Sequence, residues 1–482
     1  MLSSSSRPTP SSSSSTAHSL APAYILRGHA APVSVLRFSS CARYLYSADT
    51  DGFVGVWNLR TCRLRWFWKA SVGGVLSVEE WDGGLLVQGR DNELRFFRFP
   101  RPFSSPSTTS DSTAPSPSAS APSPSAPSQN AELRQPEWTM RINAMNFCRM
   151  SVLSLSAERG QTDIKGKGKE REGLVALPSL TKDDFVDIFH VPSQARIHRS
   201  VGAGAAAIGE KTGSVMAVHL FHLPSPSSAS PNSASPPSSS SSATAPSPPL
   251  QLHLLIAFES GALTLFRFTP TKSFSRASPT SSSSSTSGGV PDSISSEGEW
   301  MPLPGRLIEE GEGWEVVWSE KGHRDAVMSL AVSLDKRFAY TVAADHFVCK
   351  YRILDLNEEE AALPRMLVET TTSPGKSAVA VREDGKLVAT AGWDGETRLY
   401  SARTLSPLAV LSHHRTSLQA LAFAPLSPSS TSAVPLEDAL GGESDSEEEG
   451  AERSEARAWL AMGGQETKIS LWEVYPPTRG KA

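Results

Sequence analysis

The chain has 482 residues, of which 39% are apolar and 20% charged, and its formal net charge at pH 7 is −4. This balance gives no strong attraction to nucleic acid or to an anionic membrane, so we expect direct contact with neither. Its cysteines (Cys41, Cys62, Cys148 and Cys349) form no Cys-x-x-Cys pair, which argues against a zinc ribbon or a disulfide framework. No apolar run reaches the roughly 18–20 residues that span a bilayer. The Ser-rich N-terminus lacks the apolar core of a secretory signal. We therefore expect a soluble intracellular protein.

Tracts rich in Ser and Pro interrupt the sequence at several places. They contain too few large apolar residues to offset the entropy lost on ordering, so we predict that they are disordered. The predicted tails are 1–21 and 476–482, and the predicted inserts cover about 101–135, 224–249, 270–298 and 425–457. The remaining sequence is left to form the folded part, which we expect to extend over 22–475.

Short alternating apolar segments recur along that folded part between turn residues, a pattern typical of β-strands. In chain order the groups are 33–38, 44–47 and 53–57; 74–78, 85–88 and 93–99; 142–147, 173–177 and 185–191; 214–221, 252–258 and 262–268; runs over about 314–354 and 366–404; and a last group from 408 that ends with 459–462 and 468–475. One further segment, 24–27, precedes the first group. Because the last group lacks a fourth strand, we expect segment 24–27 to complete it.

One spacing of polar and aromatic residues occurs in three of these groups. The three sets are His29, Ser47, Asp51 and Trp57; His323, Thr341, Asp345 and Tyr351; and Thr390, Asp394 and Tyr400, which has no leading His. In each set the hydroxyl precedes the Asp by 4 residues, and the Asp precedes the aromatic residue by 6. The last group keeps His414 and Trp472, with Met462 and Glu466 at the hydroxyl and Asp positions.

This spacing resembles the WD40 repeat, in which four strands form one blade of a β-propeller. The resemblance implies that the His, hydroxyl, Asp and aromatic side chains form a buried hydrogen-bonded chain that holds each blade in register. Without its low-complexity tracts the sequence has roughly 330 residues, close to seven units of ~40–45 residues. We therefore predict an all-β fold, a single seven-bladed WD40 β-propeller with long disordered Ser/Pro-rich inserts.

A His, Ser and Asp set is also compatible with a hydrolase. The nucleophile would be buried, however, the set recurs at the repeat spacing, and the sequence has no Gly-x-Ser-x-Gly elbow. We therefore expect no enzymatic activity, no catalytic residue, and no cofactor or metal site.

Residues in the turns between the second and third strands of a blade are candidates for partner binding. Trp393 precedes the turn residue Asp394, and an aromatic side chain exposed there is a plausible anchor. The alternative is that Trp393 packs under a neighbouring loop. Arg90 and Lys182 occupy comparable turns in the second and third groups.

The acidic stretch 444–449 contains Ser444 and Ser446 with glutamates three residues after each, which makes both candidates for phosphorylation. The favoured alternative is an acidic solubilising loop.

Particular stretches resemble one family more closely than the general repeat. The segments 22–29, 47–57, 389–395, 398–400 and 469–475 are similar to the fungal ASTRA-associated WD-repeat proteins, whose animal relative is the G-protein β-subunit-like protein 1. The resemblance implies a non-enzymatic scaffold subunit of an ASTRA-like nuclear complex, involved in chromatin remodelling and in maturation of phosphatidylinositol-3-kinase-like kinases. The implied partners are AAA+ ATPases, a Tel2-type scaffold and a large kinase-like protein. The implied location is the nucleus, with the cytoplasm as a second compartment.

Other functions for a propeller remain as alternatives. The first is a substrate receptor of a ubiquitin ligase. The second is a G-protein β subunit, against which residues 1–20 carry no heptad repeat that could hold a γ partner. The third is an enzyme, which would need convergent carboxylates or metal ligands at the central channel.

Overall fold

The computed structural model describes residues 21–99, 134–145, 147–155, 171–202, 212–224, 250–274, 301–302, 306, 308–355, 357–426 and 458–475. Most of each predicted tail and insert lies outside these residues, and so do Ser444 and Ser446. Within the described ranges the chain forms 28 strands and one short helix, α1 (Glu358–Ala361). No helix in these ranges is long and apolar enough to cross a membrane.

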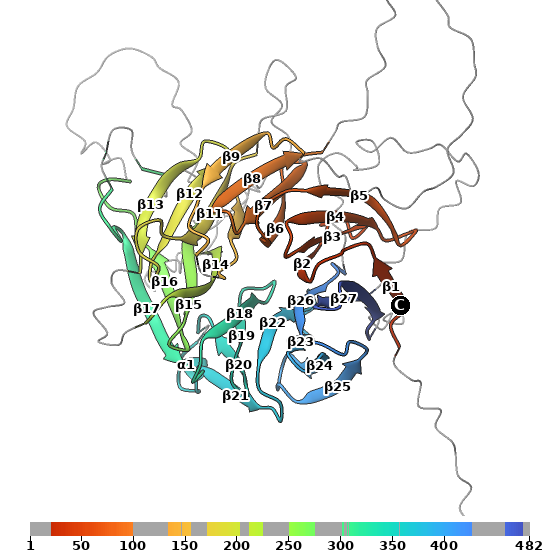
Figure 1. Ribbon diagram of the computed structural model, residues 1–482. Helices are drawn as coiled ribbons and strands as arrows, with labels where there is room; N and C mark the ends of the chain where they lie inside the picture. The colour runs from red at the N-terminus through yellow and green to blue at the C-terminus, as the bar shows by residue number, and fades with distance from the viewer. Residues whose placement is uncertain are drawn as a thin grey trace, which may run out of the picture.

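The strands form seven four-stranded antiparallel sheets that are arranged around a ring (Figure 1). The first four blades are β2 (Val33–Phe38), β3 (Tyr44–Asp49), β4 (Phe53–Asn58) and β5 (Arg63–Lys69); β6 (Val75–Trp81), β7 (Gly84–Gly89), β8 (Glu93–Arg98) and β9 (Trp138–Arg141); β10 (Ser151–Ser154), β11 (Gly173–Pro178), β12 (Val186–Val191) and β13 (Ala195–Val201); and β14 (Val215–Pro224), β15 (Leu250–Phe258), β16 (Ala262–Phe268) and β17 (Trp314–Lys321).

The other three blades are β18 (Val327–Val332), β19 (Phe338–Ala343), β20 (Phe347–Arg352) and β21 (Met366–Thr370); β22 (Lys376–Val381), β23 (Leu387–Gly392), β24 (Glu396–Ser401) and β25 (Pro407–Ser412); and β26 (Leu418–Phe423), β27 (Trp459–Gly464), β28 (Lys468–Glu473) and β1 (Tyr24–Arg27). The predicted all-β, seven-bladed propeller is therefore confirmed. The first strands of most neighbouring blades contact one another, for example β2 with β6 and with β26, and line the inner part of the ring.

The strand boundaries follow the alternating segments closely except in the third blade. Its first strand is β10, whereas the sequence predicts a strand at 142–147. Residues 142–147 instead belong to the connection between the second and third blades, because Ile142 and Ala144 are buried as loop anchors and imitate strand alternation. The runs 314–321 and 366–370 form the outer strands of the fourth and fifth blades. The sequence groups predicted at 314–354 and 366–404 therefore each begin with the last strand of the preceding blade.

The ring closes through β1, which pairs with β28 and completes the seventh blade, as the sequence predicts. In the register of this pair, Tyr24 lies opposite Leu471 and Arg27 lies opposite Lys468. The Leu26 side chain is buried in an apolar cluster that joins the seventh and first blades. Tyr24 also contacts the Trp459 ring edge to face, with centroids 5.9 Å apart. The two ends of the described chain therefore meet in one blade.

Serine side chains on the inner strands link neighbouring blades. The Ser34 hydroxyl of the first blade donates to the Val75 carbonyl of the second at 2.8 Å, and Ser377 of the sixth donates to Leu418 of the seventh at 2.6 Å. The Ser151 hydroxyl of the third blade accepts from the backbone N–H of Leu220 in the fourth at 2.9 Å. Because these bonds satisfy polar groups at the narrowest part of the ring, they fix the positions of adjacent blades.

Loss of β1 is expected to destabilise the whole ring. A variant lacking residues 1–28 loses the pairing with β28 and the burial of Leu26, whereas a variant lacking residues 1–20 keeps both. Circular dichroism melting and size-exclusion chromatography should show that the longer deletion lowers the melting temperature or causes aggregation. Equal melting curves for the two truncations would contradict this account of ring closure.

Candidate functional site

The propeller presents one face built from two kinds of connection. Because successive strands are antiparallel, the turns between second and third strands lie at the same end of the blades as the connections from one blade to the next. We call this end the turn face; it includes turns 50–52, 90–92, 179–185, 393–395 and 465–467 and connections 28–32, 70–74, 142–150 and 413–417. The two kinds of connection touch: the backbone N–H of Val72 donates to Asp91 at 3.0 Å.

A buried chain of hydrogen bonds, which we call the relay, links the strands of the first blade to its connection on the turn face. The Trp57 indole N–H donates to the Ser47 hydroxyl at 2.8 Å, and Ser47 lies 2.7 Å from Nε2 of His29. Nδ1 of His29 lies 2.7 Å from a carboxylate oxygen of Asp49. With the indole as an obligatory donor, the network assigns the His29 proton to Nδ1. Each buried polar side chain of the relay therefore has a partner.

Asp51, which the sequence places in this network, does not join it. Asp49 takes its position: it is the last residue of β3, fully buried, and it also accepts from the backbone N–H groups of Asp51 and Phe53 at 3.1 and 2.9 Å. Asp51 lies exposed at the turn. Asp49 ends β3 just before the turn, and Asp51 lies in the turn itself. The spacing pattern selected Asp51, although a second acidic residue, Asp49, stands two positions earlier in the sequence.

The fifth blade brings together the predicted His323, Thr341 and Asp345. Nε2 of His323 lies 2.8 Å from the Thr341 hydroxyl, and Nδ1 lies 3.1 Å from both carboxylate oxygens of Asp345. Tyr351 replaces the indole, and its ring occupies the space above Gly322, where a Cβ would lie 2.1 Å from the Tyr351 hydroxyl. Burial lowers the pKa of His323, so the ring stays neutral in the folded protein.

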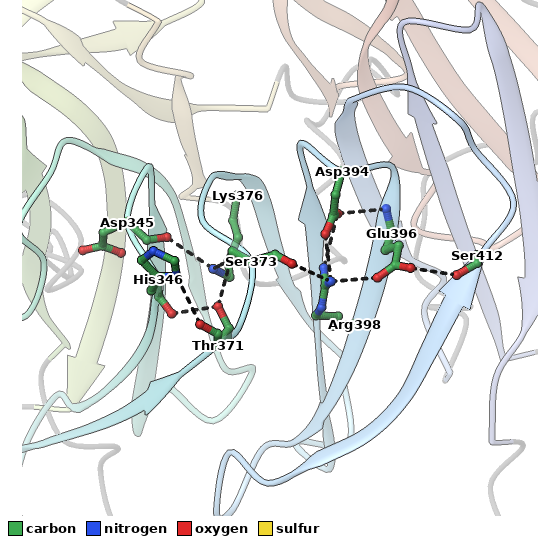
Figure 2. Close-up of polar contacts among 9 residues, drawn as sticks. All are labelled: Asp345, His346, Thr371, Ser373, Lys376, Asp394, Glu396, Arg398 and Ser412. Atoms are coloured by element: carbon green, nitrogen blue, oxygen red, sulfur yellow. Dashed lines mark hydrogen bonds and ion pairs between the residues drawn. The ribbon is translucent and has the colours of Figure 1, made fainter.

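The sixth blade has no histidine, and its polar residues are arranged differently. Thr390 and Tyr400 are buried, whereas Asp394 pairs with Arg398 at 2.8 Å on the turn face. Figure 2 shows Lys376 directed towards the fifth blade, where its ammonium donates to the carbonyls of Asp345 and Ser373 at 3.3 and 3.0 Å. Burial lowers the pKa of Lys376 to about 8. No pattern in the sequence indicates this buried lysine.

The seventh blade supplies its hydroxyl from a different strand. His414 Nε2 lies 2.9 Å from the Ser470 hydroxyl, which also accepts from the Trp472 indole N–H at 3.0 Å. Ser470 on β28 lies directly opposite Met462 on β27, the position where the repeat pattern expects the hydroxyl. The seventh blade therefore keeps the relay, but its hydroxyl comes from β28 and not from β27. Glu466 lies 3.7 Å from Nδ1 of His414, beyond hydrogen-bond distance.

In the first, fifth and seventh blades the polar sets are buried and hydrogen-bonded within the blade, which suits them to holding strands in register. In the ranges that the structure describes, no group of three or more His, Cys, Asp or Glu side chains is placed to hold a metal ion. What the turn face offers is a set of exposed side chains.

Large apolar side chains gather on the turn face of the first three blades. We call Val72, Met145, Phe147 and Leu180 the apolar loop cluster; Val72, Met145 and Phe147 are 73%, 85% and 61% exposed. The predicted candidate Arg90 belongs to it, because its guanidinium lies 4.5 Å from the centre of the Phe147 ring.

Hydrogen bonds hold the loops of this cluster together. Asn92 accepts from the backbone N–H of Ala144 at 3.0 Å, and Asn143 donates to the Ser179 carbonyl at 2.7 Å. The exposed side chains are therefore presented by a fixed backbone.

The other two candidates, Lys182 and Trp393, have surroundings that differ from those of the apolar loop cluster. Lys182 pairs with Glu310 at 3.2 Å, so its charge is already compensated. Trp393 is 46% exposed and rests its ring on the connection from the fifth blade, where a Cβ on Gly375 would lie 2.2 Å from it. Trp393 thus both packs on a loop and presents an indole surface to solvent.

Comparisons with known proteins agree with this architecture. The family described as WD domain, G-beta repeat, matches residues 20–58. Over 94% of its length the chain is 28% identical to ASTRA-associated protein 1 of Aspergillus niger, covering 97% of that protein. Over the same share it is 28% identical to ASTRA-associated protein 1 of Penicillium rubens, covering 97%, and 25% identical to that of Schizosaccharomyces pombe, covering 99%.

Replacing Asp49 is expected to destabilise the protein much more than replacing Asp51. Asp49→Ala leaves the buried His29 ring and two turn N–H groups without their acceptor, which costs about 2–4 kcal/mol in the free energy of unfolding. Asp51→Ala removes an exposed side chain and should change it by less than about 0.5 kcal/mol. Urea denaturation of both variants measures the difference, and a larger loss for Asp51→Ala would show that the relay is wrongly assigned.

Lowering the pH should decrease the free energy of unfolding, because the buried His414 resists protonation in the folded protein. Burial lowers the pKa of His414 from 6.5 to about 4, with Glu466 opposing this shift and His413 and Lys468 adding to it. Between these pH values the unfolded chain binds a proton that the folded protein does not, so stability is full above pH ~6.5 and falls as the pH drops towards ~4. The contribution lost between pH 7 and pH 5 is about 2 kcal/mol.

A matched variant isolates this contribution. Burial also lowers the pKa of His219 to about 3 and that of His222 to about 4, so both act in the same direction as His414. Urea denaturation at several pH values should therefore give a shallower loss of stability for His414→Gln than for the parent protein. Identical slopes would exclude His414 as a source of the acid sensitivity.

Proposed function

Because the chain belongs to the ASTRA-associated WD-repeat protein family, we propose that it is a non-enzymatic scaffold subunit of an ASTRA-like nuclear complex. The observation that carries this proposal is similarity over 94% of the chain to relatives that bear the name ASTRA-associated protein 1. The similarity therefore extends along nearly the whole chain and is not confined to the single repeat at 20–58. In such a complex the protein would serve chromatin remodelling and the maturation of phosphatidylinositol-3-kinase-like kinases.

The geometry of the turn face supports a binding role. The apolar loop cluster places three strongly exposed large side chains on loops that hydrogen bonds hold in place. Aromatic and methionine side chains, with arginine, are the residue types that protein interfaces favour at their centres. Since the backbone beneath them is already ordered, a partner that docks here would lose little conformational freedom in the propeller.

Affinity purification of the tagged full chain from native cells, read by mass spectrometry, tests this function. We expect AAA+ ATPases, a Tel2-type scaffold and a large kinase-like protein to co-purify, in a nuclear fraction. A Met145→Asp/Phe147→Asp variant should recover at least about tenfold less of the partner that docks on the cluster, because losing central apolar contacts costs 2 kcal/mol or more. Trp393→Ala, purified in parallel, reports whether the sixth blade contributes.

Leu334→Asp is the control for this experiment. Leu334 is 60% exposed, but it lies in the turn between β18 and β19, at the opposite end of the blades. Its replacement should leave recovery unchanged. Recovery of ubiquitin-ligase adaptors in place of the expected partners would favour a substrate-receptor propeller, and recovery of no stable partner would reject the scaffold function.

A further inference from the structure

A second feature of the turn face lies between the sixth and seventh blades. His413, Arg415, Glu466 and Lys468 line a surface hollow of about 440 Å³. His413 and Arg415 come from the connection between β25 and β26, and Glu466 comes from the turn between β27 and β28. Lys468 is the first residue of β28. Three of the four side chains that line the hollow therefore belong to basic residue types.

The single acid in the hollow is engaged with the protein itself. One carboxylate oxygen of Glu466 accepts from the backbone N–H of Arg415 at 2.6 Å, and the other faces Nδ1 of His414 at 3.7 Å. The side chains of Arg415 and Lys468 make no hydrogen bond or ion pair with any residue in the described ranges. The hollow therefore carries more basic than acidic side chains, with Glu466 facing both Arg415 and Lys468.

Ring closure adds a further cation next to this hollow. Arg27 on β1 lies directly opposite Lys468 on β28, and Arg27 is exposed. Two like charges opposite each other in an antiparallel pair are destabilising. Two other cations on the turn face are paired with acids, Arg95 with Asp91 and Arg398 with Asp394. An anionic ligand would give the cations around Lys468 a comparable partner.

The turn that carries Trp393 lies beside this hollow, although the indole ring itself rests on Gly375. The turn packs on the connection that carries His413 and Arg415, since a Cβ on Gly395 would lie 2.6 Å from the His414 carbonyl oxygen. Figure 2 shows Glu396, two residues after Asp394, where its carboxylate accepts from the Ser412 hydroxyl at 3.2 Å within the sixth blade. A ligand seated in the hollow would reach the indole of Trp393 by extending across this turn.

We propose that this hollow binds an acidic peptide segment of a partner protein, with an adjoining apolar residue packed on Trp393. Arg415, Lys468 and Arg27 would hold consecutive Asp or Glu carboxylates through charge-assisted hydrogen bonds. The indole would add an apolar contact at the end of the acidic block. A long nucleic acid fits less well, because the chain as a whole carries a net charge of −4.

Fluorescence anisotropy with purified full-length protein tests the proposal. The probe is a fluorescein-labelled peptide with the acidic block Glu-Glu-Asp-Glu followed by Leu, and its matched control carries Gln-Gln-Asn-Gln in place of the acids. We expect the acidic probe to bind at least about tenfold more tightly than the amide peptide, and to weaken as salt is added. Absence of binding by the acidic probe would overturn the proposal.

Matched variants locate the binding. Arg415→Glu/Lys468→Glu should weaken the acidic probe at least about tenfold, and Trp393→Ala about threefold or more. The control pair, Arg60→Glu/Arg63→Glu, changes two exposed arginines at the opposite end of the first blade and should stay within about twofold of the parent protein. Equal losses in the two charge-reversal pairs would mean that the probe senses overall charge, which would overturn the site.

A second variant guards against misfolding. If Arg415→Glu/Lys468→Glu melts at a lower temperature than the parent protein, Arg415→Gln/Lys468→Gln replaces it, and unchanged binding by that variant would also overturn the site. The measurement needs no other subunit, so its failure would leave the purification result for the proposed complex untouched.

Discussion

The antiparallel pairing of β1 with β28 is the contact on which the rest of the ring depends. Without it, the seventh blade would expose the polar edge of β28 and the first blade would lose the apolar cluster that it shares with Leu26. Arg149, in the connection that leads into the third blade, reinforces the same junction. Its guanidinium donates to the carbonyl of Ser34 in the first blade and to that of Gln419 in the seventh, at 3.1 and 3.3 Å. Closure therefore unites three blades.

Local patterns predicted the blades well where each strand follows its own alternation. The segments at 33–38, 53–57 and 262–268 coincide with β2, β4 and β16 almost residue for residue. The prediction for the third blade was wrong because 142–147 alternates like a strand, whereas the Asn143 side chain donates to the Ser179 carbonyl and accepts from the Met145 N–H, which holds this part of the chain as a loop. Periodicity cannot separate these cases, since both bury every second residue.

The sequence predicted the residue types of the buried polar networks, but not always the positions that supply them. Spacing found His29, His323 and His414, yet it chose Asp51 over Asp49 and expected a hydroxyl at Met462. The relay tolerates such exchanges because any hydroxyl that reaches the same point in space completes it, and Ser470 does so from the opposite strand. Lys376 and the basic hollow gave no local signal, because their partners come from other blades, and Arg27 is separated from Lys468 by nearly the whole chain.

The two exposed features of the turn face differ in chemistry and lie on different blades of one ring. The apolar loop cluster belongs to the first three blades, and the basic hollow belongs to the last two. Hydrogen bonds between inner strands tie adjacent blades, for example through Ser34 and Ser377, so the two features cannot move together into a single site. A rigid ring with an apolar patch and a basic one is suited to hold two different protein segments at a fixed separation. In the scaffold role that we propose, the propeller would set the distance between two partners, and neither partner would need to contact the other.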